Sequence, residues 1–394
     1  MERSILWSFE VVTVIVDLPS APKRARQFFY LGILHFSVLL RYDTDVMTEI
    51  PHDLRNHLSK EEALKQLAEE SFSRRVISFY RYVRIADPVA LRNELFAEWQ
   101  KLGCLGRIYV AEEGINAQMS VPEPNFERFQ TLLYARPELT DVPFKVGVEQ
   151  RDEAFWKLTI KVKRQIVADG LKATDYDVTN VGTHLSAREF NELLEEPETV
   201  VVDMRNNYES TIGRFERAIT PNAFTFREEL PMAKEALRGK EDQKVLLYCT
   251  GGIRCEKASS YLKHHGFKNV YQLHGGIIDY KRQIEREGLA SKFKGKNFVF
   301  DERLGERITD DVLAHCYQCD AVCDDYTNCQ NLECNLLFIQ CASCQEKFAG
   351  CCSTECQAIA LLPETEQAKL RKGKLFPKNH QTFKKKIALD HCSA

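Results

Sequence analysis

The segment Lys244-Val-Leu-Leu-Tyr-Cys-Thr-Gly-Gly-Ile-Arg254 passes from an apolar run into a turn with two adjacent glycines. The apolar run predicts a buried parallel strand over 244–249, and residues 255–265 predict a helix that Gly266 ends. Cys249 therefore stands at the carboxyl end of a strand, where α/β sheets place their ligand sites. Because glycine lets successive amides point inward, and a helix start carries positive partial charge, we expect Cys249 to be a reactive thiolate.

The length of this turn separates two kinds of chemistry. Phosphatases built on the related scaffold have a turn one residue longer, which gives a ring of amides wide enough for phosphate. The shorter ring favours a sulfane sulfur, so the thiol could carry a persulfide that the same amides stabilise. We expect Arg254 to close the loop and to help hold the anionic sulfur or the substrate. The residues between Cys249 and Arg254, which form the expected anion cradle, are Thr250, Gly251, Gly252 and Ile253.

Strands and helices alternate around the loop, which predicts a doubly wound α/β domain over 178–292. A capping box from Ser186 to Glu189 opens one helix, and further strands are expected at 200–203 and 270–273. Asp203 and Arg205 follow the first of these strands. We expect them to support the loop through ion pairs instead of acting directly in catalysis.

Residues 75–172 predict a second compact domain. Its expected order is β-α-β-β-α-β, which indicates a ferredoxin-like (acylphosphatase-like) sandwich. The last of its strands is expected at 156–162. A helical lead-in over 47–74 precedes it, and Ser59 could cap a short helix there. With the cysteine-rich segment described below, the chain is expected to be a multidomain protein of α/β and α+β class.

Residues 1–46 have a different character. The apolar run 28–40 follows three basic residues, but it is too short to span a membrane and no small-residue cleavage site follows it. We expect these residues to be a non-native or disordered extension, with Met47 as the true start.

Cysteines cluster near the C-terminus, within a module expected over 293–360. Ten of the fourteen fall there, including two C-x-x-C pairs, which is a strong signal for metal ligation. Zinc is the favoured metal; disulfides, a metal-free state and an iron–sulfur cluster are the alternatives. Two four-thiolate sites would use eight of the ten, with His315 as a lesser candidate. The ten are Cys316, Cys319, Cys323, Cys329, Cys334, Cys341, Cys344, Cys351, Cys352 and Cys356.

Basic residues suggest where RNA could bind, although the net charge is only −3. Lys157, Lys161 and Lys163 share one face of a predicted strand, and a basic tail over 361–394 contains Lys384, Lys385 and Lys386. A solvated strand face and a solvated tail would show the same patterns.

Three motifs together resemble one protein family. They are Glu113-Gly-Ile-Asn-Ala117, Cys249-Thr-Gly-Gly-Ile-Arg-Cys-Glu-Lys-Ala258 and Lys296-Asn-Phe-Val-Phe-Asp-Glu-Arg303. The chain resembles, over roughly 73–356, the bacterial oxygen-dependent tRNA uridine hydroxylases, rhodanese-domain proteins that make 5-hydroxyuridine at the wobble position.

The resemblance implies hydroxylation of uridine 34 in the anticodon loop of tRNA, with Cys249 required. It also implies molecular oxygen as co-substrate, a reductant that the sequence does not identify, and a cytoplasmic location. Neither a membrane nor a stable protein partner is expected. Cys255 could resolve a disulfide or persulfide on Cys249, but a helix N-cap or a packing role is favoured. Arg214 stands where many rhodanese domains have histidine, which puts only a structural contact in doubt.

Two other functions compete with this hypothesis. A sulfurtransferase that passes sulfane sulfur to a thiol or to RNA would rest on the loop alone, and it would need neither the sandwich nor the cysteine-rich module. A non-catalytic binding module is disfavoured, because the cysteine, glycines and arginine of the loop are all present.

Overall fold

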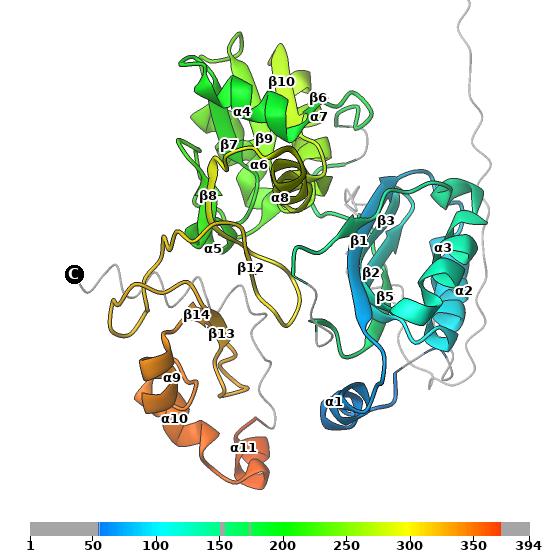
Figure 1. Cartoon of the computed structure of the whole chain (residues 1–394), viewed down its shortest axis with the longest axis vertical. Helices are drawn as coiled ribbons and strands as arrows, with labels where there is room; N and C mark the ends of the chain where they lie inside the picture. The colour runs from blue at the N-terminus through cyan, green and yellow to red at the C-terminus, as the bar shows by residue number, and fades with distance from the viewer. Residues whose placement is uncertain (1–53, 55, 150–153, 173–174, 372–394) are drawn as a thin grey trace, which may run out of the picture. The chain divides into compact units, whose positions relative to one another are not determined.

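The computed structural model describes residues 54, 56–149, 154–172 and 175–371 (Figure 1). The expected extension at 1–46 and the tail lysines at 384–386 lie outside the described residues. The lead-in helix α1 spans Lys60–Ala68. It begins with a complete capping box, in which Ser59 accepts from the Glu62 amide and Glu62 accepts from the Ser59 amide.

The N-terminal domain is the expected ferredoxin-like sandwich, with one strand reassigned. Its sheet has the order β4-β1-β3-β2-β5, and its first four strands show the antiparallel pairing of that fold. The segment predicted as the fourth strand of the fold is instead β5, which pairs parallel to β2 at the far edge. The fold's fourth strand is the two-residue β4, too short to be recognised by alternation. The strands are β1 Arg74–Tyr82, β2 Leu105–Ala111, β3 Gly114–Pro122, β4 Lys145–Val146 and β5 Leu158–Val162.

Two helices cover one face of this sheet (Figure 1). They are α2 Pro88–Lys101 and α3 Phe126–Tyr134, and the short 3-10 turns η2 Glu123–Asn125 and η3 Pro137–Leu139 flank α3. Trp99 and Phe129 pack on Phe79 in a core that also contains Leu158 and Ile160. Because strand residues alternate between faces, the residues next to these point to the opposite face, which is called helix-free here because neither α2 nor α3 covers it.

The central domain is doubly wound, as predicted. Its four parallel strands have the order β6-β10-β9-β7. Helices α6 and α7 pack on one face with Val245 and Leu247, whereas α4 and α8 pack on the other with Leu246 and Tyr248. The elements are β6 Thr183–Leu185, α4 Ala187–Glu195, β7 Val200–Asp203, α5 Asn207–Thr211, α6 Phe226–Ala236, β9 Lys244–Tyr248, α7 Ile253–His264, β10 Asn269–Leu273 and α8 Gly276–Glu287.

A small sheet links this domain to the cysteine-rich module. Strand β11 pairs with β8 on one side and β12 on the other, so the segment after α8 returns to the central domain before the cysteines begin. Among the described residues, none of the helices has the length and hydrophobicity of a membrane span. The remaining elements are β8 Gly213–Phe215, β11 Phe293–Asn297, β12 Glu306–Arg307, β13 Tyr326–Asn328, β14 Leu337–Ile339, α9 Ala342–Lys347, α10 Thr354–Ala360 and α11 Glu364–Arg371.

Candidate active site and metal centres

Cys249 follows β9 directly and lies inside a loop whose amides surround its sulfur. The Gly252 amide donates to Cys249 Sγ at 3.1 Å. Gly252 adopts φ +94°, and a Cβ there would lie 2.9 Å from the Tyr80 hydroxyl, so only glycine fits this turn without displacing its neighbour. Helix α7 begins at Ile253, two residues earlier than expected, with Gly252 as its N-cap. The positive end of the helix is therefore closer to the sulfur than the sequence indicated.

The pKa of Cys249 is lowered to about 6. Burial alone would raise this pKa, but the Cys255 thiol donates a hydrogen bond to the sulfur, Arg254 adds positive charge, and the Arg254 and Cys255 amides donate as well. The pKa of Cys255 is raised well above its usual value by burial and by its bond to Cys249. The pair is therefore a thiolate held by a neutral thiol, and Cys255 is not the N-cap.

Arg254 is held in place by a residue that the sequence analysis missed. Both guanidinium arms of Arg254 bind the buried Glu209 carboxylate, at 2.6 and 2.8 Å, and one arm lies 3.4 Å from Thr250 Oγ1. Glu209 also accepts from the Asn206 amide, which makes a capping box at the start of α5. The capping-box spacing of Asn206 and Glu209 was therefore the sequence signal that could have identified Glu209. Arg254 closes the loop through this pair and leaves its positive charge beside Cys249.

Glu229 on α6 is a second buried acid behind the loop. Neither of its carboxyl oxygens has a hydrogen-bond partner among the described residues. Burial raises its pKa well above the usual range, although the nearby Arg254 opposes this. The raised pKa favours the protonated form of Glu229, which would add no negative charge beside Cys249.

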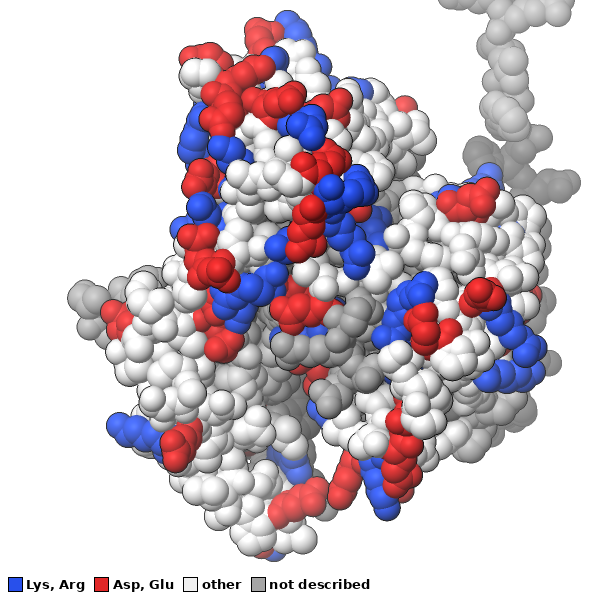
Figure 2. All heavy atoms as spheres, in the orientation of Figure 1, with Lys and Arg blue, Asp and Glu red and all other residues white. Residues whose placement is uncertain are grey.

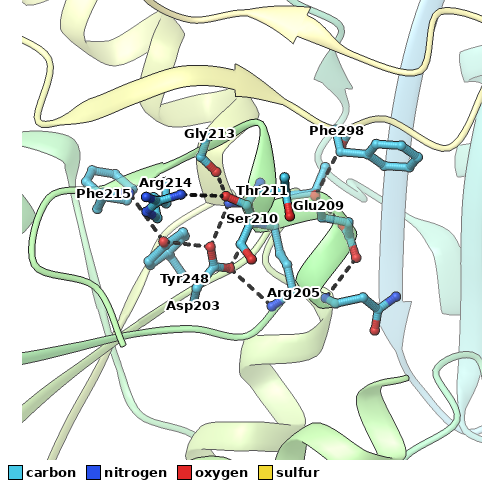
Figure 3. Close-up of polar contacts among 12 residues, drawn as sticks. Asp203, Arg205, Glu209, Ser210, Thr211, Gly213, Arg214, Phe215, Tyr248 and Phe298 are labelled. Atoms are coloured by element: carbon cyan, nitrogen blue, oxygen red, sulfur yellow. Dashed lines mark hydrogen bonds and ion pairs between the residues drawn. The ribbon is translucent and has the colours of Figure 1, made fainter. Parts of the chain in front are cut away.

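Asp203 and Arg205 form a buried ion pair beneath the loop (Figure 3). Arg205 binds both Asp203 oxygens, at 2.8 and 2.6 Å, and donates to the Gly213 carbonyl at 2.6 Å. The Tyr248 hydroxyl donates to Asp203 at 2.7 Å, one residue before Cys249. The pair thus connects the end of β7, the end of β9 and the start of β8. Arg214, which stands where many rhodanese domains have histidine, donates to the Ser210 carbonyl at 3.4 Å.

A cavity of about 400 Å³ opens above the loop. Cys249, Thr250, Gly251, Ile253 and Arg254 line one side, and the helix-free face of the sandwich sheet lines another. Cys249 borders the cavity but has no solvent-exposed area, because the turn encloses its sulfur. A substrate atom would therefore meet this sulfur only if the turn relaxed or if a sulfane sulfur extended the thiol outward.

Lys145 enters this cavity from β4. Its ammonium lies 4.3 Å from the centre of the Tyr80 ring. Burial lowers the pKa of Lys145 to about 8, although Asp279, Cys249 and Glu256 oppose the shift. Nothing in the sequence distinguished this lysine, because β4 was not predicted. The cavity thus holds a thiolate and an amine that both titrate near neutral pH.

Two of the sequence motifs meet at Lys257. Its ammonium lies 3.0 Å from Glu113 Oε2 and 3.0 Å from Asp169 Oδ2, and it is only 1% exposed. Tyr80 donates to Glu256 at 2.9 Å next to this contact. The Glu113 motif of the sandwich is therefore bound to the helix that carries the reactive loop.

The cysteine-rich module brings eight cysteines together in two groups of four. Within each group the sulfurs lie within 4.8 Å of one another. Sulfur pairs at 3.6 and 3.7 Å match the roughly 3.8 Å expected around a tetrahedral zinc with Zn–S bonds of about 2.3 Å. They are far longer than a disulfide bond, and the described cysteines are free. One group is Cys316, Cys319, Cys341 and Cys344, and the other is Cys329, Cys334, Cys352 and Cys356.

Three residues considered as ligands fall outside these groups. Cys351 Sγ is directed to the Ala349 carbonyl at 3.7 Å, and Cys323 is buried in the core around Phe298. His315 belongs to neither group. The residues of the two groups could hold one metal ion each.

Lys157, Lys161 and Lys163 are exposed along β5 and its ends. Lys157 lies over the Trp156 ring at 4.3 Å, and Lys163 lies 5.8 Å from the centre of the Tyr109 ring. Acidic and basic side chains are intermingled on the face drawn in Figure 2, so a phosphate-binding surface would have to be local.

The fold and the loop define a rhodanese-domain protein, and family models divide the chain accordingly. Residues 74–166 match the UPF0176 acylphosphatase like domain, 186–283 the Rhodanese-like domain, and 294–357 the Rhodanase C-terminal domain. A solved thiosulfate sulfurtransferase from Pseudomonas aeruginosa is 22% identical over 28% of this chain and 20% of its own, with a TM-score of 0.23, too low to inform activity.

Two curated relatives define the family. A protein of Leptospira interrogans is 56% identical over 322 residues, which is 82% of this chain and 88% of that protein. One of Pectobacterium carotovorum is 50% identical over 322 residues, 82% of this chain and 91% of its own length. Each is named tRNA uridine(34) hydroxylase. This chain belongs to the tRNA uridine(34) hydroxylase family.

Proposed function

We infer that the protein hydroxylates uridine 34 of tRNA. The observation that carries this conclusion is identity of 50–56% to named hydroxylases over 82% of the chain, a stretch that includes the complete reactive loop. The expected product is 5-hydroxyuridine, and molecular oxygen is the expected co-substrate.

We propose that Cys249 is the residue of the loop that reacts with the substrate. Its thiolate is the strongest nucleophile that borders the cavity, since the pKa is about 6. The Gly252 amide and the Cys255 thiol hold the negative charge, and Arg254, fixed by Glu209, supplies a positive field. Asp203 and Arg205 keep the strand ends in place and touch neither the sulfur nor the cavity.

Zinc is the metal that we propose for the two cysteine groups. Four-sulfur coordination leaves no open position for substrate, so the role of the metal would be to hold the module together. The module contains few strands, all short, and would otherwise have little to stabilise it.

The function can be tested in cells that lack the protein. Wobble nucleosides from tRNA are measured by mass spectrometry after complementation with wild type, Cys249→Ala or Cys104→Ala. Cys104 is the matched control, because it is buried in the sandwich and burial raises its pKa to about 12. We expect 5-hydroxyuridine and its derivatives to return with wild type and Cys104→Ala only. Unchanged levels in the deletion strain, with no second pathway present, would refute the proposal.

The sulfurtransferase alternative rests on the short cradle around Cys249. If this alternative holds, the same experiment should detect 2-thiouridine, and only when Cys249 is intact. The binding of Glu113 to Lys257 disfavours this alternative, because a plain sulfurtransferase has no need of a sandwich domain attached to its catalytic helix.

A further inference from the structure

The helix-free face of the sandwich sheet, called the open face below, presents two rows of side chains. Strand register places Tyr80, Asn116, Tyr109 and Lys161 side by side across β1, β3, β2 and β5. The next row crosses β4, β1, β3, β2 and β5 and consists of Lys145, Ser78, Gln118, Arg107 and Thr159. None of these nine side chains is acidic.

The open face is continuous with the cavity at Cys249. Seven of its nine residues line that cavity; Lys161 and Thr159 lie one strand further out, on β5. Tyr80 marks the Cys249 end, since its hydroxyl is the atom nearest to a Cβ placed on Gly252. Three strand spacings of about 4.8 Å separate β1 from β5, so the rows extend roughly 14 Å from the reactive loop to the exposed lysines.

The chemistry of the face changes along this path. At the β5 edge, Lys157, Lys161 and Lys163 are exposed and could contact phosphates. Tyr109 is half-buried one strand inward, with the Lys163 ammonium 5.8 Å from its ring centre. The acids Asp301 and Glu306, on the segment that faces the sheet across the cavity, are both ion-paired with Arg303, and burial raises the pKa of Glu306. The path along the face thus leads from positive charge, past an aromatic ring, to the loop that encloses the Cys249 thiolate.

We propose that the open face binds the single-stranded RNA next to the target uridine. The RNA strand crosses the sheet from β5 to β1. Its phosphates lie on Lys157, Lys161 and Lys163, and a neighbouring base stacks on Tyr109. Single-stranded RNA is bound in this way by proteins that combine a basic groove with aromatic platforms. This inference rests on the proposed function, and it assigns the place from which the anticodon loop enters the cavity.

The test measures binding of an anticodon stem-loop RNA to the full chain. Tyr109→Ala should weaken binding about 5- to 150-fold, whereas Tyr109→Phe, which keeps the stacking ring, should bind like wild type. Lys161→Gln should weaken binding and lower the slope of log affinity against log salt by about 1. Arg128→Gln is the control, because Arg128 is exposed on α3 at the helix-covered face. Thermal unfolding of each variant shows that it is folded.

Several results would overturn the inference. Wild-type affinity in Tyr109→Ala, an equal loss in Arg128→Gln, or equally tight binding of a fully paired RNA would each exclude the open face as the single-strand site. In those cases the wild-type enzyme still hydroxylates tRNA, and only this inference fails. A wild-type protein that neither binds the stem-loop nor changes wobble uridine would refute the proposed function and this inference together.

Discussion

The hydrogen bond from Cys255 to Cys249 should control the acidity of the reactive thiol. With a pKa of about 6, Cys249 is about nine-tenths thiolate at pH 7. Removing a hydrogen bond to a charged group costs about 1.5–3 kcal/mol, so Cys255→Ala should raise the Cys249 pKa to about 7–8. At pH 6.5 the thiolate population would then be about 3- to 25-fold smaller than in the wild type. Cys255→Ser keeps a donor and should titrate close to wild type.

The assay follows alkylation of Cys249 by iodoacetamide as a function of pH. Trypsin releases Val245–Arg254, a peptide that contains no other cysteine, so mass spectrometry reads this thiol alone among fourteen. The variants are compared by the pH midpoint of this profile and not by the absolute alkylation rate, because the intrinsic reactivity of a thiolate also changes with its pKa. Hydroxylation activity should fall as the pH drops through the same midpoint, since the protonated thiol is unreactive. A wild-type midpoint in Cys255→Ala would show that Cys255 has no part in the low pKa.

Three further predictions concern the surroundings of the loop and the metal sites. Activity should also decline above pH 8, where Lys145 loses its charge. Lys145→Met should remove this decline at high pH and raise the pH midpoint of Cys249 alkylation. An unchanged pH profile in the variant would show that Lys145 does not cause the decline. Glu209→Gln should lower the free energy of unfolding by about 3–5 kcal/mol in a denaturant titration, because it strands the buried charge of Arg254; a variant as stable as wild type would contradict the pair. Cys329→Ser should reduce bound zinc, measured by elemental analysis, from about two ions per chain to about one, and iron in the wild-type protein would exclude the zinc assignment.

The sequence predicted the features that depend on local pattern. The β9 run, the helix cap at Ser59, the capping box at Ser186 and the doubly wound arrangement all follow from periodicity and spacing, and the structure contains each of them. The start of α7 was placed two residues late because Gly252 has no side chain to mark a cap. Strand β4 was missed because two residues show no alternation.

Long-range pairing could not be predicted in the same way. Glu209 lies 45 residues from Arg254, and Lys145 reaches the cavity from another domain, so neither partner could be inferred from spacing. Lys157 and Lys161 were recognised as a basic stripe, but their register with Tyr109 depends on β5 pairing parallel to β2. Sequence patterns report which face a residue occupies, whereas the identity of its neighbour depends on how strands are ordered.

The contact of Lys257 with Glu113 and Asp169 has a practical consequence for dissecting this protein. Lys257 lies one turn past the start of α7, and both of its carboxylate partners belong to the segment before the rhodanese domain. An excised rhodanese domain would lose both carboxylates and the Val167 carbonyl, so water would replace them around the ammonium and α7 would lose its attachment to the sandwich. Activity assays on the fragment would then report on a reactive loop that differs from the one in the full-length chain. Substitutions at Glu113 and at Lys257 should likewise be tolerated better together than singly.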